Sequence, residues 1–237
     1  MATQVSLIFP VYNEQDRVKN IPSIIEYFRG CFFSDFELIV VCNACTDQTF
    51  NLATAFATRF PEIRVLDTPV PGRGNALKLG FLHSSGDLVA VCAIDRAWDE
   101  SFYLAARKIL NSDNYDVVFG PKSHPDSKVV RPIYRTLPSY LLKIYLMFMF
   151  QLPNVDTNCI KMFKRRSCGF LDDLNNFNYF AETEFYLLAM KNKLRVISVP
   201  VSVNDSNQGS KVRISSFFQF FSESIQYKFK YILFVNV

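Results

Sequence analysis

The chain has 237 residues, of which 49% are apolar, and its net charge is +4 at neutral pH. A chain of this length and composition can bury the core of one α/β domain. Acidic and basic residues are interspersed without a long basic block, which argues against a nucleic-acid-binding face. The mild positive charge suits small anionic ligands and an anionic membrane surface equally well.

The N-terminus and the cysteines both indicate a cytoplasmic protein. A strand-like run begins within the first few residues, which leaves no room for a secretory signal sequence. The six cysteines are scattered through apolar segments, as expected for reduced thiols. Cys42 and Cys45 form a C-x-x-C pair, but the chain has two histidines and no second such pair to complete a zinc site. We therefore expect neither a zinc site nor a redox role for this pair.

Short apolar runs alternate with helical patterns over the first 95 residues. Strands are predicted at 5–9, 37–42, 63–66 and 88–92, with a helix between each pair. This alternation predicts a mostly parallel, Rossmann-like sheet with right-handed crossovers and helices on both faces. Because such sheets bind ligands at the carboxyl ends of their strands, the loops after these four strands should line one cleft.

The second half of the chain is less regular. A strand is predicted at 116–119, an apolar helix at 139–150, and a helix at 181–192 followed by a strand at 194–199. The longest apolar stretch, 140–153, contains Lys143 and Gln151 and is too short to span a bilayer. The tail from 212 to 237 is rich in Phe and Tyr. It is expected to be either an amphipathic helix in a membrane interface or a last helix packed on the domain.

Three of the loops carry residues that suit a nucleotide. In the first, 10–14 (PVYNE), a Tyr ring can stack on a base, and in the first and second (43–49) Asn, Asp and Glu side chains can bond its edge or a ribose. Caps and turns use the same residue types, so each motif alone is weak. The third loop, 71–77, places Arg73 at a helix N-terminus, where an anion is favoured.

Taken in order, these segments resemble the nucleotide-sugar-binding half of family 2 glycosyltransferases with the GT-A fold. The family motifs are P-x-Y-N-E, similar to 10–14; [DN]-G-S/C-x-D-x-T, similar to 43–49 with Ala44 for Gly; G-K-G-x-A, similar to 72–76; and the Gly-Asp before a D-x-D metal motif, similar to 86–87. In that family these segments bind the base and ribose, the diphosphate and a divalent metal. The resemblance implies that the sugar nucleotide is bound by Pro10, Tyr12, Asn13, Glu14, Asn43, Asp47, Arg73 and Asn75.

The metal motif departs from the family pattern. Ala93 stands where the family has its first Asp, so Asp95 is the remaining metal-binding and catalytic carboxylate, and Asp99 is a substitute of unknown geometry. One carboxylate and the substrate diphosphate can still hold Mg²⁺ or Mn²⁺, because these ions keep several waters. A nucleotide-sugar-binding protein with weakened catalysis is therefore an alternative.

The second half resembles the enzymes that charge a dolichyl or other polyprenyl phosphate with one sugar. Arg131 and Arg135 precede the apolar helix, as an Arg-containing segment does in those enzymes. Three later segments are similar to D-T-Q-x-G-F-K-x-F, F-D-V-E-L and V-P-V … G-S-K-V of those enzymes, namely 156–163, which is one residue shorter, 181–185 and 199–212.

The proposed acceptor needs little chemical activation. A phosphate monoester is already a nucleophile, so positioning and charge neutralisation supply most of the rate. Arg131, Arg135 and Lys211 are candidates for holding the acceptor phosphate or the leaving diphosphate. Glu182 and Glu184 are candidate general bases if the acceptor is instead a hydroxyl.

The sequence therefore predicts a glycosyltransferase that moves a hexose from GDP-mannose or UDP-glucose to a polyprenyl or dolichyl phosphate at the cytosolic membrane face. Inversion at the sugar is what the resemblance implies. The expected boundaries are a GT-A domain at 1–212, with a nucleotide-sugar-binding half (1–120) and an acceptor half (121–212), and an amphipathic tail at 213–237. A family 2 transferase acting on a glycan or lipid hydroxyl is the other enzymatic alternative.

Overall fold

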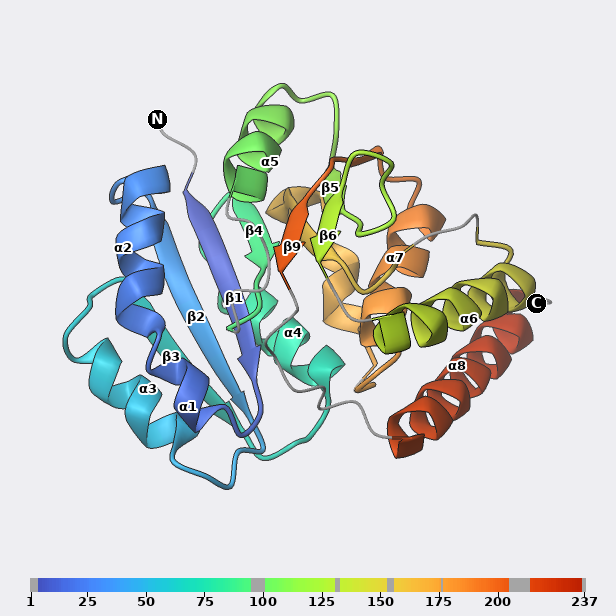
Figure 1. Cartoon of the computed structure of the whole chain (residues 1–237), viewed down its shortest axis with the longest axis horizontal. Coiled ribbons are helices and arrows are strands. Elements are labelled where there is room, and N and C mark those ends of the chain that lie inside the picture. Colours follow the sequence, from blue (N-terminus) through green and yellow to red (C-terminus); the bar gives the residue numbers. More distant parts are fainter. Residues whose placement is uncertain are drawn as a thin grey trace.

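The computed structural model describes residues 4–94, 101–130, 133–152, 156–175, 177–204 and 214–235. Within helices α6 and α8, side chains are described over 138–150 and 215–230. These residues form one seven-stranded sheet with helices against both of its faces and a separate two-stranded sheet (Figure 1).

The central sheet has the strand order β3-β2-β1-β4-β7-β5-β8. Its strands are β1 (Val5–Val11), β2 (Phe36–Asn43), β3 (Ile63–Thr68), β4 (Leu88–Val91), β5 (Val117–Gly120), β7 (Ile160–Lys164) and β8 (Val196–Ser198). All of its pairings are parallel except those of β7, which is antiparallel to β4 and β5. The mostly parallel sheet predicted from the sequence is confirmed. The second sheet pairs β6 (Lys128–Val130) with β9 (Ser202–Asn204).

The helices join these strands and cover both faces of the central sheet. They are α1 (Gln15–Val18), α2 (Ile21–Phe32), α3 (Thr49–Ala57), α4 (Arg73–Leu82), α5 (Ser101–Asn111), α6 (Ile133–Phe150), α7 (Ala181–Lys191) and α8 (Ile214–Val235), with short 3-10 helices at Arg165–Ser167 and Gly169–Asp173. Leu7 and Phe9 of β1 belong to the same buried cluster as α2, whereas Ile8 belongs to the cluster that contains Leu77 of α4. Successive strand residues point to opposite faces, so a strand buried on both sides is a nearly continuous apolar run.

The antiparallel strand β7 is not expected from the sequence, because two lysines interrupt its apolar residues. The structure nevertheless buries all five of its residues, including Lys161 and Lys164. Each lysine is buried against an acid, since Lys161 contacts Glu182 and Lys164 contacts Asp113. Pairing with distant acids therefore lets both lysines be buried in a strand that lies between β4 and β5.

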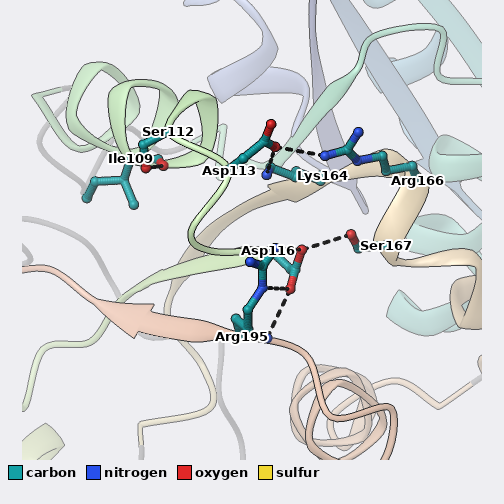
Figure 2. Close-up of polar contacts among 8 residues, drawn as sticks. All are labelled: Ile109, Ser112, Asp113, Asp116, Lys164, Arg166, Ser167 and Arg195. Carbon is teal, nitrogen blue, oxygen red and sulfur yellow. Dashed lines mark hydrogen bonds and ion pairs between the residues drawn. The ribbon is translucent and has the colours of Figure 1, made fainter.

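An ionic cluster lies at the end of the central sheet opposite the carboxyl ends of its parallel strands (Figure 2). Asp116, just before β5, accepts hydrogen bonds from Arg195 Nε at 2.9 Å and Nη2 at 3.0 Å, and from Ser167 Oγ at 3.1 Å. Asp113 pairs with Lys164 and, at 2.8 Å, with Arg166. These contacts connect the start of β5, the end of β7 and the approach to β8.

Helix α8, which lies beside α6 in Figure 1, packs on α6 and on the start of α7. The rings of Tyr145 in α6 and Phe221 in α8 have centroids 4.6 Å apart. Glu223 of α8 accepts hydrogen bonds of 2.9 to 3.1 Å from the backbone N–H groups of residues 178–180. An acid at this position satisfies N–H groups at the N-terminus of α7 and suits its dipole. Across the described residues, no helix has both the length and the apolar character needed to cross a bilayer.

Candidate active site

A cleft of about 520 Å³ opens at the carboxyl ends of β1, β2 and β4. The predicted loops converge there, because the lining includes Pro10 near the end of β1, Tyr12 after it, Asn43 at the end of β2, and Ala93 after β4. Arg73, the first residue of α4, joins them. From the second half of the chain, residues 158–160, 178–179 and 182 complete the wall together with Lys122.

Two residues of the cleft are suited to hold a base. Tyr12 leaves 57% of its surface exposed, so its ring is accessible for stacking. Asn43 is 7% exposed, and among the described residues its Oδ1 has no hydrogen-bond donor. An unsatisfied buried acceptor costs about 1–3 kcal/mol, which a donor on a bound ligand would recover.

Asn13 and Asp47 hold the first two loops together and do not line the cleft. Asn13 Oδ1 accepts a hydrogen bond of 2.8 Å from the Thr46 N–H, and Asp47 Oδ2 accepts one of 3.4 Å from the Gln15 N–H. Asp47 Oδ1 also accepts a hydrogen bond of 2.9 Å from the Thr49 N–H. Burial opposes ionisation of Asp47, but the hydrogen bonds, chiefly those from Thr49, outweigh it and lower the pKa of this carboxyl below its ordinary value. These two predicted residues therefore shape the loops that present Tyr12 and Asn43.

The third loop is fixed by Asn75 and Gly74. Asn75 Nδ2 donates to Thr68 Oγ1 at 3.0 Å and to the Val70 carbonyl at 2.9 Å, and Asn75 is not part of the lining. A Cβ at Gly74 would lie 2.2 Å from the Asn175 carbonyl oxygen, so any larger residue would push the helix away. This close approach sets the start of α4 and hence the position of Arg73.

Arg73 and Glu182 of the cleft lining form an ion-pair cluster with the buried Lys161. Glu182 Oε1 accepts a hydrogen bond of 2.6 Å from Arg73 Nε, and Glu182 Oε2 accepts one from Lys161 Nζ. Burial opposes the ionisation of Glu182, but the neighbouring Lys161 and Arg73 outweigh it and lower its pKa to about 2. At neutral pH this carboxylate is ionised and engaged by two cations, which makes it a weak proton acceptor.

Glu184 is directed away from Glu182 and does not line the cleft. Its Oε1 accepts hydrogen bonds from the backbone N–H and the side-chain amide of Asn175, and Lys230 Nζ donates to Asn175 Oδ1 at 2.7 Å. Burial raises the pKa of Glu184 to about 7. Residues two apart on a helix do not share a face, so α7 sends its two acids to different environments.

A second hollow of about 410 Å³ adjoins the cleft, with Lys122 and Asn158 in both linings. Its wall combines Lys122 and Lys143 with apolar side chains of β6 and α6, which are Val129, Tyr140, Leu142 and Leu146. The two hollows thus adjoin, and the second is lined by Asp156 as well as by the two lysines and the apolar side chains. Asp95, Asp99, Arg131, Lys211 and the side chain of Arg135 lie outside the described residues.

The comparison with known proteins decides the family. Residues 6–171 match the model of "Glycosyl transferase family 2". The chain belongs to this family. It is therefore a glycosyltransferase, and its seven-stranded, mostly parallel sheet is that of the GT-A fold.

Curated relatives and solved structures that resemble this glycosyltransferase agree with that membership. A dolichyl-phosphate beta-glucosyltransferase of Trichomonas vaginalis is 27% identical over 227 residues, which cover 89% of this chain and 68% of the relative. The dolichyl-phosphate beta-glucosyltransferase of Saccharomyces cerevisiae is 23% identical, with 89% and 70% covered. Mannosyl-3-phosphoglycerate synthase of Rubrobacter xylanophilus shares the fold with a TM-score of 0.70 and 16% identity over 96% of this chain and 74% of that one.

Several cleft residues of this glycosyltransferase are not predicted from the sequence, namely Lys122, Asn158, Asn178 and Tyr179. A signal exists for Lys122, because it follows the strand predicted at 116–119, and sheets of this kind bind ligands at the carboxyl ends of their strands. Asn158 lies in the segment 156–163 that resembles a family motif, and no comparable signal marks Asn178 and Tyr179. They enter the cleft because β7 runs antiparallel and because Glu223 holds the start of α7.

Proposed function

We propose that this glycosyltransferase moves a hexose from a nucleotide diphosphate sugar to a polyprenyl phosphate. Two adjoining hollows support the proposal. Residues of the loops predicted to bind a nucleotide line the first, and lysines and apolar side chains line the second. Such a pair suits a polar donor beside an acceptor with a charged head and a hydrocarbon chain. The relatives named as dolichyl-phosphate beta-glucosyltransferases support this choice of acceptor.

On the donor side, the base would stack on Tyr12 and give an N–H to Asn43 Oδ1. Uracil and guanine both carry such a donor, so UDP-glucose and GDP-mannose both remain candidates. Arg73 and the N-terminus of α4 would face the diphosphate, because exposed N–H groups and a guanidinium both favour an anion. Asn13, Asp47 and Asn75 would support these contacts through the loops that they fix.

A divalent ion fits this site only as part of a complex with the donor. Within the described residues, no three His, Cys, Asp or Glu side chains gather as a metal site, and Ala93 in the cleft offers no ligand. Asp95 would supply one carboxylate, with the substrate diphosphate and water supplying the rest. When bound, the ion would neutralise charge on the departing diphosphate. Glucosyl-3-phosphoglycerate synthase of Mycobacterium tuberculosis, whose structure contains Mn²⁺ and UDP, has the same fold with a TM-score of 0.64 and 17% identity, covering 94% of this chain and 77% of that one.

On the acceptor side, a phosphate oxygen would attack the anomeric carbon as the bond from that carbon to the nucleotide diphosphate breaks. Lys122 and Lys143, with Arg131, Arg135 and Lys211, would hold the phosphate groups in line. No base is needed for this acceptor. The pairing of Glu182 with two cations and the distance of Glu184 from the cleft lining favour it over a hydroxyl acceptor.

Transfer from radiolabelled GDP-mannose and UDP-glucose to dolichyl phosphate, with Mn²⁺ or Mg²⁺, tests the proposal. Dolichol is the matched control, because it has the same chain with a hydroxyl in place of the phosphate. We expect labelled lipid from dolichyl phosphate, and loss of that product after chelation with EDTA and in Asp95→Ala. Label on dolichol alone would establish the hydroxyl acceptor, and nucleotide binding without any product would indicate a chain that has lost catalysis.

A further inference from the structure

Lys161 is a fully buried cation whose place in the chemistry the sequence does not reveal. Its side chain is 0% exposed, and its ammonium lies 5.4 Å from the centre of the Phe185 ring as well as against Glu182. The next residues of the strand, Met162 and Phe163, are apolar and equally buried. The burial of a lysine at this position therefore calls for a physical reason.

Stability alone does not supply that reason. Removing two charges from water costs about as much as their attraction returns, so a buried ion pair can often be replaced by apolar residues without loss. The ion pair of Lys161 and Glu182 anchors one end of a series of contacts in the core. That series runs from Lys161 on β7 through Glu182 on α7 to Arg73 on α4, and it ends at the cleft surface.

We propose that Lys161 and Glu182 are positioning residues that fix the guanidinium of Arg73 for binding the diphosphate of the donor. This inference rests on the proposed function, because it requires a nucleoside diphosphate in the cleft. A guanidinium whose Nε is held by a carboxylate keeps its plane, and it then presents its terminal nitrogens in a set direction. Lys161 fixes the second oxygen of Glu182, so the carboxylate cannot rotate away from Arg73.

The charges of the cluster agree with this role. Two cations and one anion leave one positive charge in excess, and Arg73 is the member with the more exposed side chain, at 37% against 6% for Glu182. A positive charge held in advance at this point stabilises the negative charge that grows on a departing diphosphate. A Glu182 acting as a base would instead need a free oxygen, and both of its oxygens are engaged.

Calorimetric titration with UDP and GDP in the presence of Mn²⁺, and with uridine and guanosine, tests the inference. The informative variant is the double substitution Lys161→Met with Glu182→Gln, which removes both buried charges together and so avoids leaving either one unpaired. We expect it to melt close to the wild type yet to bind the diphosphates about tenfold more weakly, with nucleoside affinity unchanged, as expected for the loss of one oriented charged contact. In an Arg73→Met background, the same double substitution should change diphosphate affinity less than about twofold, because coupled residues are not additive.

Lys164→Met is the matched control. Lys164 is a buried lysine of the same strand, and it pairs with Asp113 outside the cleft lining. Its loss should therefore lower the melting temperature and leave diphosphate affinity unchanged. Wild-type diphosphate affinity in the double variant would overturn the inference while leaving the proposed function standing. Equal weakening of nucleoside and diphosphate binding would also overturn it, because that is a general packing defect. Absence of UDP and GDP binding in the wild type would refute the donor half of the proposed function and the inference with it.

Discussion

At the scale of single residues, the cleft contains a buried hydrogen-bond acceptor that no described residue satisfies. Asn43 Oδ1 is buried at the end of β2, and Tyr12, which lines the same cleft, is accessible. A protein tolerates such an atom where a ligand completes its hydrogen bonding, because leaving it unsatisfied is costly. Asn43 is therefore the residue through which base recognition can be tested most directly.

We expect Asn43→Leu to weaken UDP or GDP binding by about 1–2 kcal/mol, roughly tenfold, because the base loses its acceptor. The melting temperature of the free protein should change little, since the substitution removes an atom that makes no hydrogen bond. Titration calorimetry and thermal denaturation measure the two effects. Asn51→Leu, an exposed change outside the cleft lining, is the control. Undiminished affinity in Asn43→Leu would place the base elsewhere.

Glu184 gives a second prediction at this scale, on the pH dependence of stability. Its pKa is about 7 in the folded chain against an ordinary value of 4.5, because burial disfavours the charged form. Between these values the folded state holds a proton that the unfolded state has released, so the free energy of unfolding falls as the pH rises. The contribution of this group is on the order of 3 kcal/mol.

Glu184→Gln should therefore flatten the decline of stability between pH 4.5 and pH 7. Urea denaturation at pH 5 and pH 8 measures this, and the gap between variant and wild type should widen in favour of the variant at pH 8. Lys230 and Glu223 are the charged groups near Glu184, and both remain in the variant. An identical pH profile in variant and wild type would show that Glu184 is not held protonated.

At the scale of elements, charged side chains join strands whose sequences give no sign that they are neighbours. Asp116 connects the start of β5 with Arg195 before β8 and with Ser167 after β7. The bidentate bond from Arg195 outweighs burial and lowers the pKa of Asp116 to about 2. The stabilisation by this group is thus complete above the ordinary pKa of 3.8 and is lost as the pH falls toward 2.

We expect Asp116→Asn to lower the free energy of unfolding at pH 7 by about 1 kcal/mol, a value reduced for solvent screening because Arg195 is half exposed. The difference from wild type should vanish near pH 2. Asp113→Asn is the control in the same cluster, because Asp113 is largely exposed and its loss should matter less (Figure 2). Equal losses in both variants would contradict the assignment of the anchoring role to Asp116.

At the scale of the whole molecule, α6 and α8 form an outward surface next to the proposed acceptor hollow (Figure 1). Exposed aromatic side chains lie on both helices, and they are Tyr140, Phe148, Phe218 and Phe229. Lys143 and Lys230 belong to the same two helices. Aromatic and cationic side chains on a helix surface suit an anionic membrane interface, and a lipid acceptor would enter the hollow from there.

The double substitution Phe218→Ser with Phe229→Ser should reduce flotation with vesicles that contain anionic phospholipid, because both rings are exposed and would enter the interface. The fold should be retained, since neither ring belongs to the buried clusters. Phe33→Ser is the control, because Phe33 is 79% exposed on α2's C-terminal side, away from α6 and α8. Unchanged flotation of the double variant would remove this surface from the mechanism.

Features that are local in the chain could be predicted without the fold. The strands at the start of the chain are short apolar runs, and each is followed by its own polar loop, so their parallel order and the convergence of Pro10, Asn43 and Arg73 on one cleft could be predicted. The same order of motifs indicated the family. The start of α6 is less regular and could not be located, because Pro138 lies inside the helix.

The roles of the charged residues, by contrast, depend on how the chain folds. Glu182 and Glu184 look equivalent in the sequence, yet α7 directs the first into the cluster with Lys161 and Arg73 and the second toward Asn175. Arg73 and Glu182 are 109 positions apart in the sequence, and the role of each depends on its contact with the other. The energy of a buried charge is set by the groups within a few ångströms of it, and those groups come from distant parts of the chain.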